Sequence, residues 1–234
     1  MIAVNIVGFK KSGKTSLVLD LAAALSASGV RVGAAKSTHS RTLDKENSDT
    51  DRLLAVSVGV AAVTPQEAAV FWPQKRYLAD LLPLLDADVV LVEGGKEYTW
   101  LPRVVLARDA AEAEALDPRK LALASYGPFA PAGLARPATI QELAELILDK
   151  AFLLPGLDCG GCGRDDCGDL AAHIVAGTAT MAECASLGGK CHVAIGGNPL
   201  PLNPFVERML ACGIRAMLAQ LKGYTPGVIE MKME

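Results

Sequence analysis

The stretch that decides the fold lies near the amino terminus and reads Gly8-Phe9-Lys10-Lys11-Ser12-Gly13-Lys14-Thr15. It satisfies the G-x-x-x-x-G-K-[ST] pattern of a phosphate-binding loop, or P-loop. Glycines are needed because the backbone must turn tightly and direct its N–H groups at the phosphates. A strand candidate at 2–7 precedes the pattern and a helix candidate at 15–28 follows it. The motif requires this order, and the alternative is a glycine turn with solvated lysines.

The side chains of this loop have separate predicted roles. Lys14 is expected to reach the β- and γ-phosphate oxygens, and the Thr15 hydroxyl is expected to bind Mg²⁺. The amino end of the following helix adds a partial positive charge at the same place. The predicted nucleotide-binding residues of the loop are Gly8, Lys10, Lys11, Ser12, Gly13, Lys14, Thr15 and Ser16.

Strand and helix candidates alternate along the chain from this loop to residue 150. Apolar runs predict strands at 2–7, 30–35, 60–64, 89–92, 103–107 and 121–125. Helical periodicity predicts helices at 15–28, 51–57, 74–85, 110–116 and 140–148. This alternation favours an α/β fold, a P-loop NTPase with a mostly parallel sheet flanked by helices. The pattern does not reveal the order of the strands in the sheet.

A carboxylate follows the most hydrophobic strand candidate, at 89–92. Glu93 is predicted there to hold Mg²⁺ through water or to polarise an attacking water. Glu93 and Lys14 are therefore the candidate catalytic residues. The alternative for Glu93 is an ordinary strand end with a solvated glutamate.

Two further aspartates are candidates for the nucleotide site. The polar segment 37–50 is typical of the region that senses the γ-phosphate, and Asp44 is its first candidate Mg²⁺ ligand, beside Thr15 and Glu93. Asp109 follows a strand candidate and could accept hydrogen bonds from a guanine edge, although a solvated loop aspartate is the alternative. Guanine is not distinguished from adenine by these residues alone.

Composition excludes several classes of protein. The chain has 234 residues and a formal net charge of −3, from 23 Lys and Arg against 26 Asp and Glu. Hydrophobic residues at 51% and charged residues at 21% are typical of a globular protein. A mildly acidic chain argues against a nucleic-acid partner, and no apolar run approaches the roughly 18 residues of a membrane span. The amino terminus lacks signal-peptide features, so we expect a cytoplasmic protein with no membrane partner.

The six cysteines lie late in the chain, at positions 159, 162, 167, 184, 191 and 212. In a cytoplasmic protein we interpret them as metal ligands or thiols before disulfides. Their distribution predicts two domains, a P-loop nucleotide-binding domain at 1–150 and a small α+β iron–sulfur domain at 151–234. The second domain is expected to end in an amphipathic helix at 204–221.

Four of these cysteines have the spacing Cys159-x₂-Cys162-x₄-Cys167-x₁₆-Cys184. This spacing lets three thiolates hold one face of a cluster while the fourth arrives from beyond a helix, which favours a [4Fe–4S] cluster. Zinc is the alternative, although structural zinc usually takes two C-x₂-C pairs and only one is present here. Cys191 is a substitute ligand to be considered.

Ordered motifs accompany the P-loop through about residue 148. They are Ala35-Lys36-Ser37-Thr38-His39, then Asp44 through Asp49-Thr50-Asp51-Arg52, and Leu91-Val92-Glu93-Gly94-Gly95-Lys96. With the P-loop they resemble the molybdopterin-guanine dinucleotide biosynthesis protein B family of P-loop proteins. This chain departs from the family in having Ser40 where a second His is common. It also has Glu46-Asn47-Ser48 in place of the usual glycine.

This resemblance implies a GTP-binding accessory protein with weak hydrolysis that helps to convert or deliver a molybdenum or tungsten pterin cofactor. The implied cofactors are GTP and Mg²⁺. The implied partner is a molybdenum-cofactor guanylyltransferase or an apo-molybdo- or apo-tungsto-enzyme. Family members tend to form dimers, so a homodimer is a further expectation.

The cysteine-rich segment has a resemblance of its own. From 154 to 163, and on through Cys167 and Cys184, it is similar to a small iron–sulfur module that also occurs in corrinoid iron–sulfur proteins and in a component of an electron-transport complex. Together with the tail segments 201–206 and 221–223, the chain resembles an iron–sulfur-bearing branch of the same biosynthesis family.

Three functions remain as hypotheses. The first is a nucleotide-dependent maturation factor for a molybdenum or tungsten enzyme that carries a [4Fe–4S] cluster. The second is a nucleotide-gated iron–sulfur electron-transfer protein, which predicts a cluster potential that shifts when nucleotide binds. The third is a non-hydrolysing scaffold with a structural zinc site, which predicts zinc and no turnover.

Overall fold

A five-stranded parallel sheet forms the centre of the protein in the computed structural model, which describes residues 1–38, 48–187, 191, 193–225, 227, 229 and 231. Its strand order is β2-β5-β1-β6-β7, and every neighbouring pair is parallel. The strands are β1 (Ile2–Gly8), β2 (Val32–Lys36), β5 (Val89–Glu93), β6 (Arg103–Leu106) and β7 (Ala122–Ser125). The predicted α/β fold with a mostly parallel sheet is confirmed.

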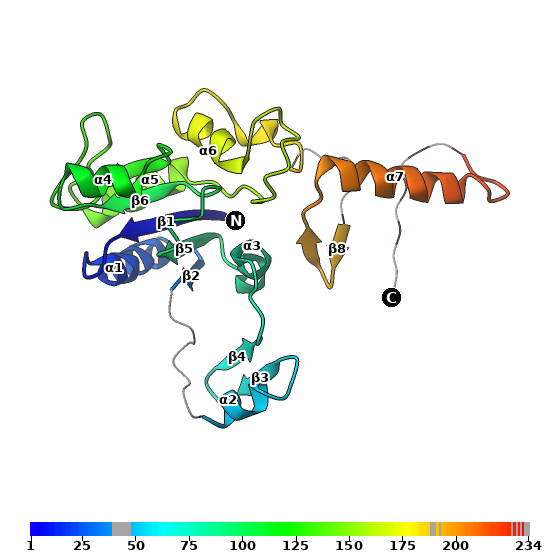
Figure 1. Ribbon diagram of the computed structural model, residues 1–234, viewed down its shortest axis with the longest axis horizontal. Helices are drawn as coiled ribbons and strands as arrows, with labels where there is room; N and C mark the ends of the chain where they lie inside the picture. Colours follow the sequence, from blue (N-terminus) through cyan, green and yellow to red (C-terminus); the bar gives the residue numbers. More distant parts are fainter. Residues whose placement is uncertain are drawn as a thin grey trace.

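Helices cover both faces of this sheet. α1 (Lys14–Ala27) and α5 (Ile140–Lys150) pack on one face, and α4 (Ala110–Leu116) and α6 (Cys167–Val175) pack on the other. Figure 1 shows α1 and α6 on opposite sides of β1. Residues of β1 alternate between the two faces, since Val4 and Ile6 lie in one hydrophobic cluster and Ala3 and Val7 lie in others. A strand buried on both faces explains the nearly continuous apolar sequence of β1.

The helices differ in how their first turns are capped. Asp109 accepts the Glu112 N–H of α4 at 2.9 Å, and Asp166 accepts the Asp169 N–H of α6 at 2.8 Å. Such a cap stabilises a helix by roughly 1 kcal/mol. The N-cap of α1 is Gly13, and no described side chain caps that helix. Its first N–H groups therefore remain available to an anion.

Short elements fill the segment between β2 and β5. They are α2 (Asp49–Leu54), the antiparallel strands β3 (Val60–Val63) and β4 (Ala68–Phe71), α3 (Leu78–Leu81) and the 3-10 helix η1 (Leu82–Leu85). The prediction of one helix at 74–85 is wrong, because regular structure begins only at Leu78 and divides in two. Pro83, in the first turn of η1, has no N–H to continue an α-helix from α3. Strand β4 was not predicted.

The segment from 151 to 187 packs against the sheet. The Ala3 N–H donates to the Phe152 carbonyl oxygen at 3.4 Å. α6 and the 3-10 helix η2 (Met181–Glu183) bring Cys167 and Cys184 into the same hydrophobic cluster as residues of β5. A division of the chain near residue 150 stays a prediction, and this hydrophobic cluster runs across that position.

A hairpin and a long helix follow. β8 (Val193–Ile195) and β9 (Asn198–Leu200) are joined by Gly196 and Gly197, whose φ angles of 59° and 83° suit glycine. α7 (Pro204–Leu218) begins with a proline in its first turn, and none of its described residues is buried. Figure 1 shows α7 to one side of the sheet. Within the described parts of the chain, no helix has the length and apolar character needed to cross a membrane.

Candidate functional site

The predicted phosphate loop joins β1 to α1. Gly8 is the last residue of β1, and a Cβ there would collide with the Ser12 Oγ and lie 3.1 Å from the Leu106 carbonyl oxygen. Gly13 has a φ of 89°, which L side chains rarely adopt. The loop leaves exposed Lys10, Lys11, Gly13, Thr15 and Ser16. Its tight, glycine-dependent backbone is the shape that a phosphate cradle requires.

Lys14 lies across this loop. Its Nζ donates to the Phe9 carbonyl oxygen at 2.8 Å. Burial lowers the pKa of Lys14, the Glu93 carboxylate opposes that shift, and the Lys96 ammonium adds to it. The Ser12 Oγ is buried and has no hydrogen-bond partner within the described chain. The loop therefore holds an ammonium on a backbone carbonyl that phosphate oxygens could replace.

Thr15, in the first turn of α1, meets Glu93, the last residue of β5. The Thr15 Oγ1 donates to the Glu93 Oε1 at 2.7 Å. The register of β1 and β5 places Ile6 opposite Glu93, so the last residue of β5 faces the start of the loop. A hydroxyl and a carboxylate are the hard oxygen donors that suit Mg²⁺. Asp44, the third predicted Mg²⁺ ligand, lies outside the described residues.

Asp109 lies at the amino end of α4, near the same edge of the sheet. One of its carboxylate oxygens accepts the Glu112 N–H at 2.9 Å, and Glu112 also pairs with Arg108. The side chain predicted to read a guanine edge is thus engaged in capping its own helix. Its contact with a nucleotide stays a prediction.

Two buried polar side chains that the sequence pattern did not single out hold the backbone just after Glu93. The Asn5 Nδ2 donates to the Gly95 carbonyl oxygen at 2.8 Å. Arg103 donates to the carbonyl oxygens of Lys96 and Tyr98 at 3.4 and 3.3 Å, and to that of Leu116 at 2.6 Å. Burial lowers the pKa of the Arg103 guanidinium. Polar residues within apolar strands were the signal that could have identified both.

The four predicted cluster ligands line one small cavity. Cys159, Cys162, Cys167 and Cys184 all contribute to its wall. Cys159 is exposed, Cys162 is half-buried, and the other two are buried. No three His, Cys, Asp or Glu side chains of the described chain are arranged to hold a single metal ion. The structure therefore brings the four cysteines to one cavity.

The backbone around this cavity is tightly folded. Gly160 and Gly163 have φ angles of 63° and 79°. The Asp158 N–H donates to the Cys167 Sγ at 3.4 Å, and the Cys167 N–H donates to the Asp158 Oδ1 at 2.9 Å. Burial raises the pKa of the Cys167 thiol. Positive-φ glycines and N–H groups directed at sulfur are features that suit an iron–sulfur cluster.

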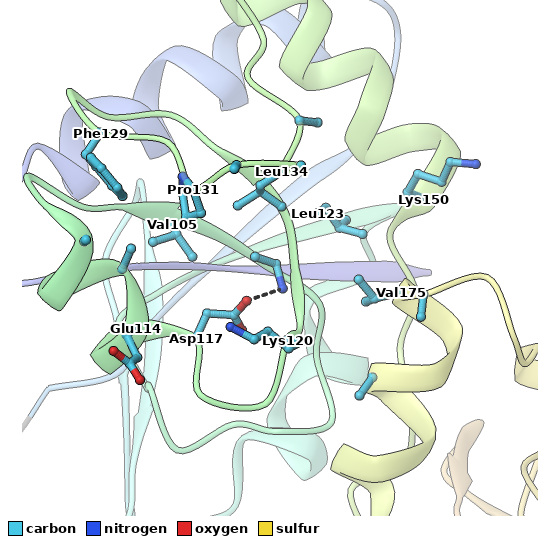
Figure 2. Close-up of a pocket in the computed structure, with 18 of the residues that line it drawn as sticks. Val105, Glu114, Asp117, Lys120, Leu123, Phe129, Pro131, Leu134, Lys150 and Val175 are labelled. Carbon is cyan, nitrogen blue, oxygen red and sulfur yellow. Dashed lines mark hydrogen bonds between the residues drawn. The ribbon is translucent and has the colours of Figure 1, made fainter.

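A separate cavity of about 860 Å³ lies along the edge strand β7. Figure 2 shows Phe129, Pro131 and Leu134 of the loop after β7 on one side and Val175 of α6 on the other. Asp117, also in its wall, accepts the N–H groups of Leu121 and Ala122 at 2.7 and 3.1 Å. The residues in this wall are not those predicted to bind nucleotide or metal.

Comparisons with known proteins find similarities in both parts of the chain. Residues 3–125 match the family model described as "Molybdopterin guanine dinucleotide synthesis protein B". The "Putative molybdopterin-guanine dinucleotide biosynthesis adapter protein" of Methanocaldococcus jannaschii is 25% identical over 100% of this chain and 98% of its own length. The "Probable molybdopterin-guanine dinucleotide biosynthesis adapter protein" of Bacillus subtilis is 31% identical over 48% of this chain and 69% of its own length.

A solved structure and a second family model extend the comparison. The crystal structure of Bacillus subtilis MobB has a TM-score of 0.53 and 23% identity, and the match covers 64% of this chain and 97% of that one, which shows a shared fold. Residues 154–186 match the family model described as "Putative Fe-S cluster". A component of the Na(+)-translocating ferredoxin:NAD(+) oxidoreductase complex of Acetobacterium woodii is 42% identical over 27% of this chain and 20% of its own length.

Proposed function

Because this chain belongs to the molybdopterin guanine dinucleotide synthesis protein B family, whose model matches residues 3–125, we propose that it is a GTP-binding adapter. It acts in the biosynthesis or delivery of the guanine dinucleotide form of the molybdenum or tungsten pterin cofactor, and it carries a [4Fe–4S] cluster. Its partner is the guanylyl-transferring enzyme or an apo-enzyme that receives the cofactor. The adapter descriptions of the two relatives support this proposal.

The observation that carries the nucleotide part is the position of Lys14 in the loop. Its ammonium lies 2.8 Å from the Phe9 carbonyl oxygen, beside the uncapped first turn of α1. Triphosphate oxygens would replace that carbonyl as the acceptor, because a charged acceptor makes the stronger hydrogen bond. The α1 N–H groups would bind the same phosphates.

Thr15 and Glu93 are proposed to hold Mg²⁺. The Thr15 hydroxyl would bind the metal through its oxygen while its proton is donated to Glu93, and Glu93 would bind the metal through a water molecule. The metal would neutralise charge on the β- and γ-phosphates. Glu93 and Lys14 are then the candidate catalytic residues for a weak GTPase activity, with Glu93 orienting the attacking water.

The four cysteines are proposed to hold the cluster. They line one cavity from two sides, since Cys159, Cys162 and Cys167 come from the loop before α6 and its first residue, and Cys184 follows η2. The cluster would supply one-electron chemistry or a structural cross-link. Zinc with a purely structural role is the outcome that would contradict this part of the proposal.

A calorimetric titration of anaerobically purified protein tests the nucleotide part. GTP with Mg²⁺ should bind more tightly than ATP, and Lys14→Ala should reduce the affinity by about 10- to 100-fold, or roughly 1.4–2.7 kcal/mol. Lys75→Ala is the control, because that ammonium lies 5.8 Å from the centre of the Tyr77 ring and outside the loop. Unchanged affinity in Lys14→Ala, with the thermal unfolding temperature also unchanged, would reject the site.

Metal and sulfide analysis of the same samples tests the cluster part. The wild-type chain should contain about four iron and four sulfide, the content of one [4Fe–4S] cluster. Serine at any one of the four cavity cysteines should lower the iron content. Cys212→Ser is the control, because Cys212 is exposed on α7 and lies outside the cavity wall. Zinc instead of iron in the wild-type protein would reject the cluster.

A further inference from the structure

The segment from Gly94 to Trp100 contacts the phosphate loop at one end and the cysteine-rich module at the other. We infer that this segment, which we name the linking segment, makes the geometry of the four-cysteine site respond to nucleotide, with Trp100 and Arg119 as positioning residues. The inference deepens the proposed function and rests on its nucleotide site.

At the nucleotide end, the linking segment continues directly from Glu93. The Lys96 Nζ lies 3.6 Å from the centre of the Phe9 ring, so the segment contacts the phosphate loop itself. Glu93 accepts the Thr15 hydroxyl at 2.7 Å. The Tyr98 Oη lies 3.2 Å from the Ser37 Oγ, where the polar segment predicted to sense the γ-phosphate begins.

The first residues of the linking segment, Gly94 and Gly95, are closely packed. A Cβ at Gly94 would lie 2.5 Å from the Ser37 carbonyl oxygen, and a Cβ at Gly95 would collide with the Tyr98 ring. The Asn5 side chain donates to the Gly95 carbonyl oxygen, and the Arg103 guanidinium donates to those of Lys96 and Tyr98. A displacement that begins at Glu93 would therefore pass from Gly95 to the Tyr98 ring and from there to Trp100, whose ring centre lies 5.8 Å from that of Tyr98, because close-packed groups transmit strain.

At the other end, the linking segment packs on two glycines of the cysteine-rich module. A Cβ at Gly156 would lie 3.1 Å from three atoms of the Trp100 indole. A Cβ at Gly168 would lie 2.8 Å from the Thr99 Cβ and would collide with the Arg119 guanidinium. Gly168 directly follows the ligand candidate Cys167, so these contacts reach the cysteine site.

Arg119 fixes the amino end of α6. It donates to both carboxylate oxygens of Asp166 at 2.7 Å each, and Asp166 is the N-cap of α6, directly before Cys167. A bidentate pair of this kind fixes the relative orientation of the two side chains and also strengthens their interaction. Trp100 thus packs on Gly156, in the loop that leads to Cys159, and Arg119 holds the amino end of the helix that begins at Cys167.

Nucleotide binding changes the other end of that segment. Mg²⁺ would bind the Thr15 hydroxyl oxygen and, through water, the Glu93 carboxylate, and phosphate would replace the Phe9 carbonyl oxygen as the acceptor of the Lys14 ammonium. The two states of the loop therefore make different contacts with Glu93, which is the condition for a ligand to shift a conformational equilibrium. By reciprocity, the state of the cluster must alter the affinity for nucleotide.

The test uses the cluster-containing chain with Trp72→Phe, which leaves Trp100 as its single tryptophan. Mg²⁺–GTP should change both the Trp100 emission and the cluster's electron paramagnetic resonance signal, with midpoints that match the calorimetric affinity. GTP should also bind the oxidised and reduced protein with different affinities. A tenfold difference corresponds to a shift of about 59 mV in the one-electron potential.

Variants at Arg119 and Gly168 separate the coupling between the two sites from nucleotide binding itself. Arg119→Ala and Gly168→Ala should reduce the cluster response at least threefold and should bring the GTP affinities of the oxidised and reduced protein to within twofold of each other. Arg119→Lys should restore part of the cluster response. Arg31→Ala is the matched control, because it breaks exposed ion pairs with Asp86 and Asp88 that do not contact the module.

The outcomes distinguish this inference from the proposed function. GTP that binds with full affinity but changes neither the Trp100 emission nor the cluster signal would overturn the inference and leave the proposed function intact. Failure of the wild-type chain to bind GTP would overturn both. Equal responses in Arg119→Ala, Arg31→Ala and wild type would remove the positioning role of Arg119.

Discussion

The Thr15 hydroxyl donates to the Glu93 carboxylate at 2.7 Å across 78 positions of sequence. This one hydrogen bond joins the phosphate loop to the end of β5, because β1 and β5 are parallel neighbours whose carboxyl ends reach the same edge of the sheet. It also marks the hydroxyl that would bind a metal directly and the carboxylate that would bind it through water. The chemistry proposed for the nucleotide site depends on this pair.

Removal of the Thr15 hydroxyl should weaken metal-dependent binding specifically. We expect Thr15→Ala to lower the affinity for Mg²⁺–GTP by about tenfold, or roughly 1.4 kcal/mol, because the metal loses a ligand. Calorimetry with Mg²⁺ and with a chelator measures the difference, and Thr15→Ser, which keeps the hydroxyl, is the control. An equal loss with and without Mg²⁺ would contradict a metal-binding role.

The phosphate loop should not tolerate a side chain at Gly8. A Cβ at this position collides with Ser12, so Gly8→Ala should destabilise the fold by about 1–3 kcal/mol, typical of overpacking, and reduce GTP affinity. Denaturant unfolding and calorimetry measure the two effects. Gly213→Ala on α7 is the control, because nothing lies within 4 Å of its Cβ. Wild-type behaviour of Gly8→Ala would show that the loop relaxes freely.

The ion pair of Arg119 and Asp166 should give the chain an acid-sensitive contribution to stability. The hydrogen bonds from Arg119 lower the pKa of Asp166. A carboxylate with a lowered folded pKa stabilises the fold above its unfolded pKa of about 4 and loses that contribution as the pH falls through the folded value. Because both side chains are partly exposed, the contribution at neutral pH should be only about 1 kcal/mol.

Two substitutions at Asp166 separate this ion pair from the helix cap. Asp166→Asn keeps a capping oxygen and loses the charge, so its unfolding free energy should differ from that of wild type at pH 7 and converge with it in acid. Asp166→Ala should lose roughly 1 kcal/mol more at every pH, because it also removes the cap. Identical pH profiles for wild type and Asp166→Asn would contradict the assigned ion pair.

Arg103 should be among the most sensitive positions of the sheet. It is 2% exposed and donates to three carbonyl oxygens, so Arg103→Met would leave those carbonyls unpaired. We expect a loss of about 3 kcal/mol, or about 6–12 °C in the unfolding temperature. Arg136→Met is the control, since that side chain is exposed and makes a 3.4 Å hydrogen bond with the Pro128 carbonyl oxygen. Equal thermal shifts would contradict a structural role for Arg103.

Sequence patterns predicted most of the sheet and failed where local signals compete. The helix predicted at 110–116 has the same bounds as α4, because the N-cap aspartate and the alanine-rich sequence both favour a helix there. Residues 74–85 have helical periodicity, yet Pro83 divides them into α3 and η1. Strand β4 was missed because two of the four residues in Ala68-Ala69-Val70-Phe71 are alanines, which are depleted in strands, and the strand is recognisable only beside β3.

By itself, the sequence determined the parallel α/β class, and it predicted the phosphate loop and the set of four cysteines, because each depends on residue types at short and regular spacing. Only the tertiary structure decided that Thr15 meets Glu93, that Asn5 and Arg103 hold the linking segment, and that Arg119 joins α6. Those pairings depend on strand order and on packing between distant segments. Such long-range packing produces no periodic pattern in the sequence, because the free energy that selects it comes from the burial of entire helix and sheet faces.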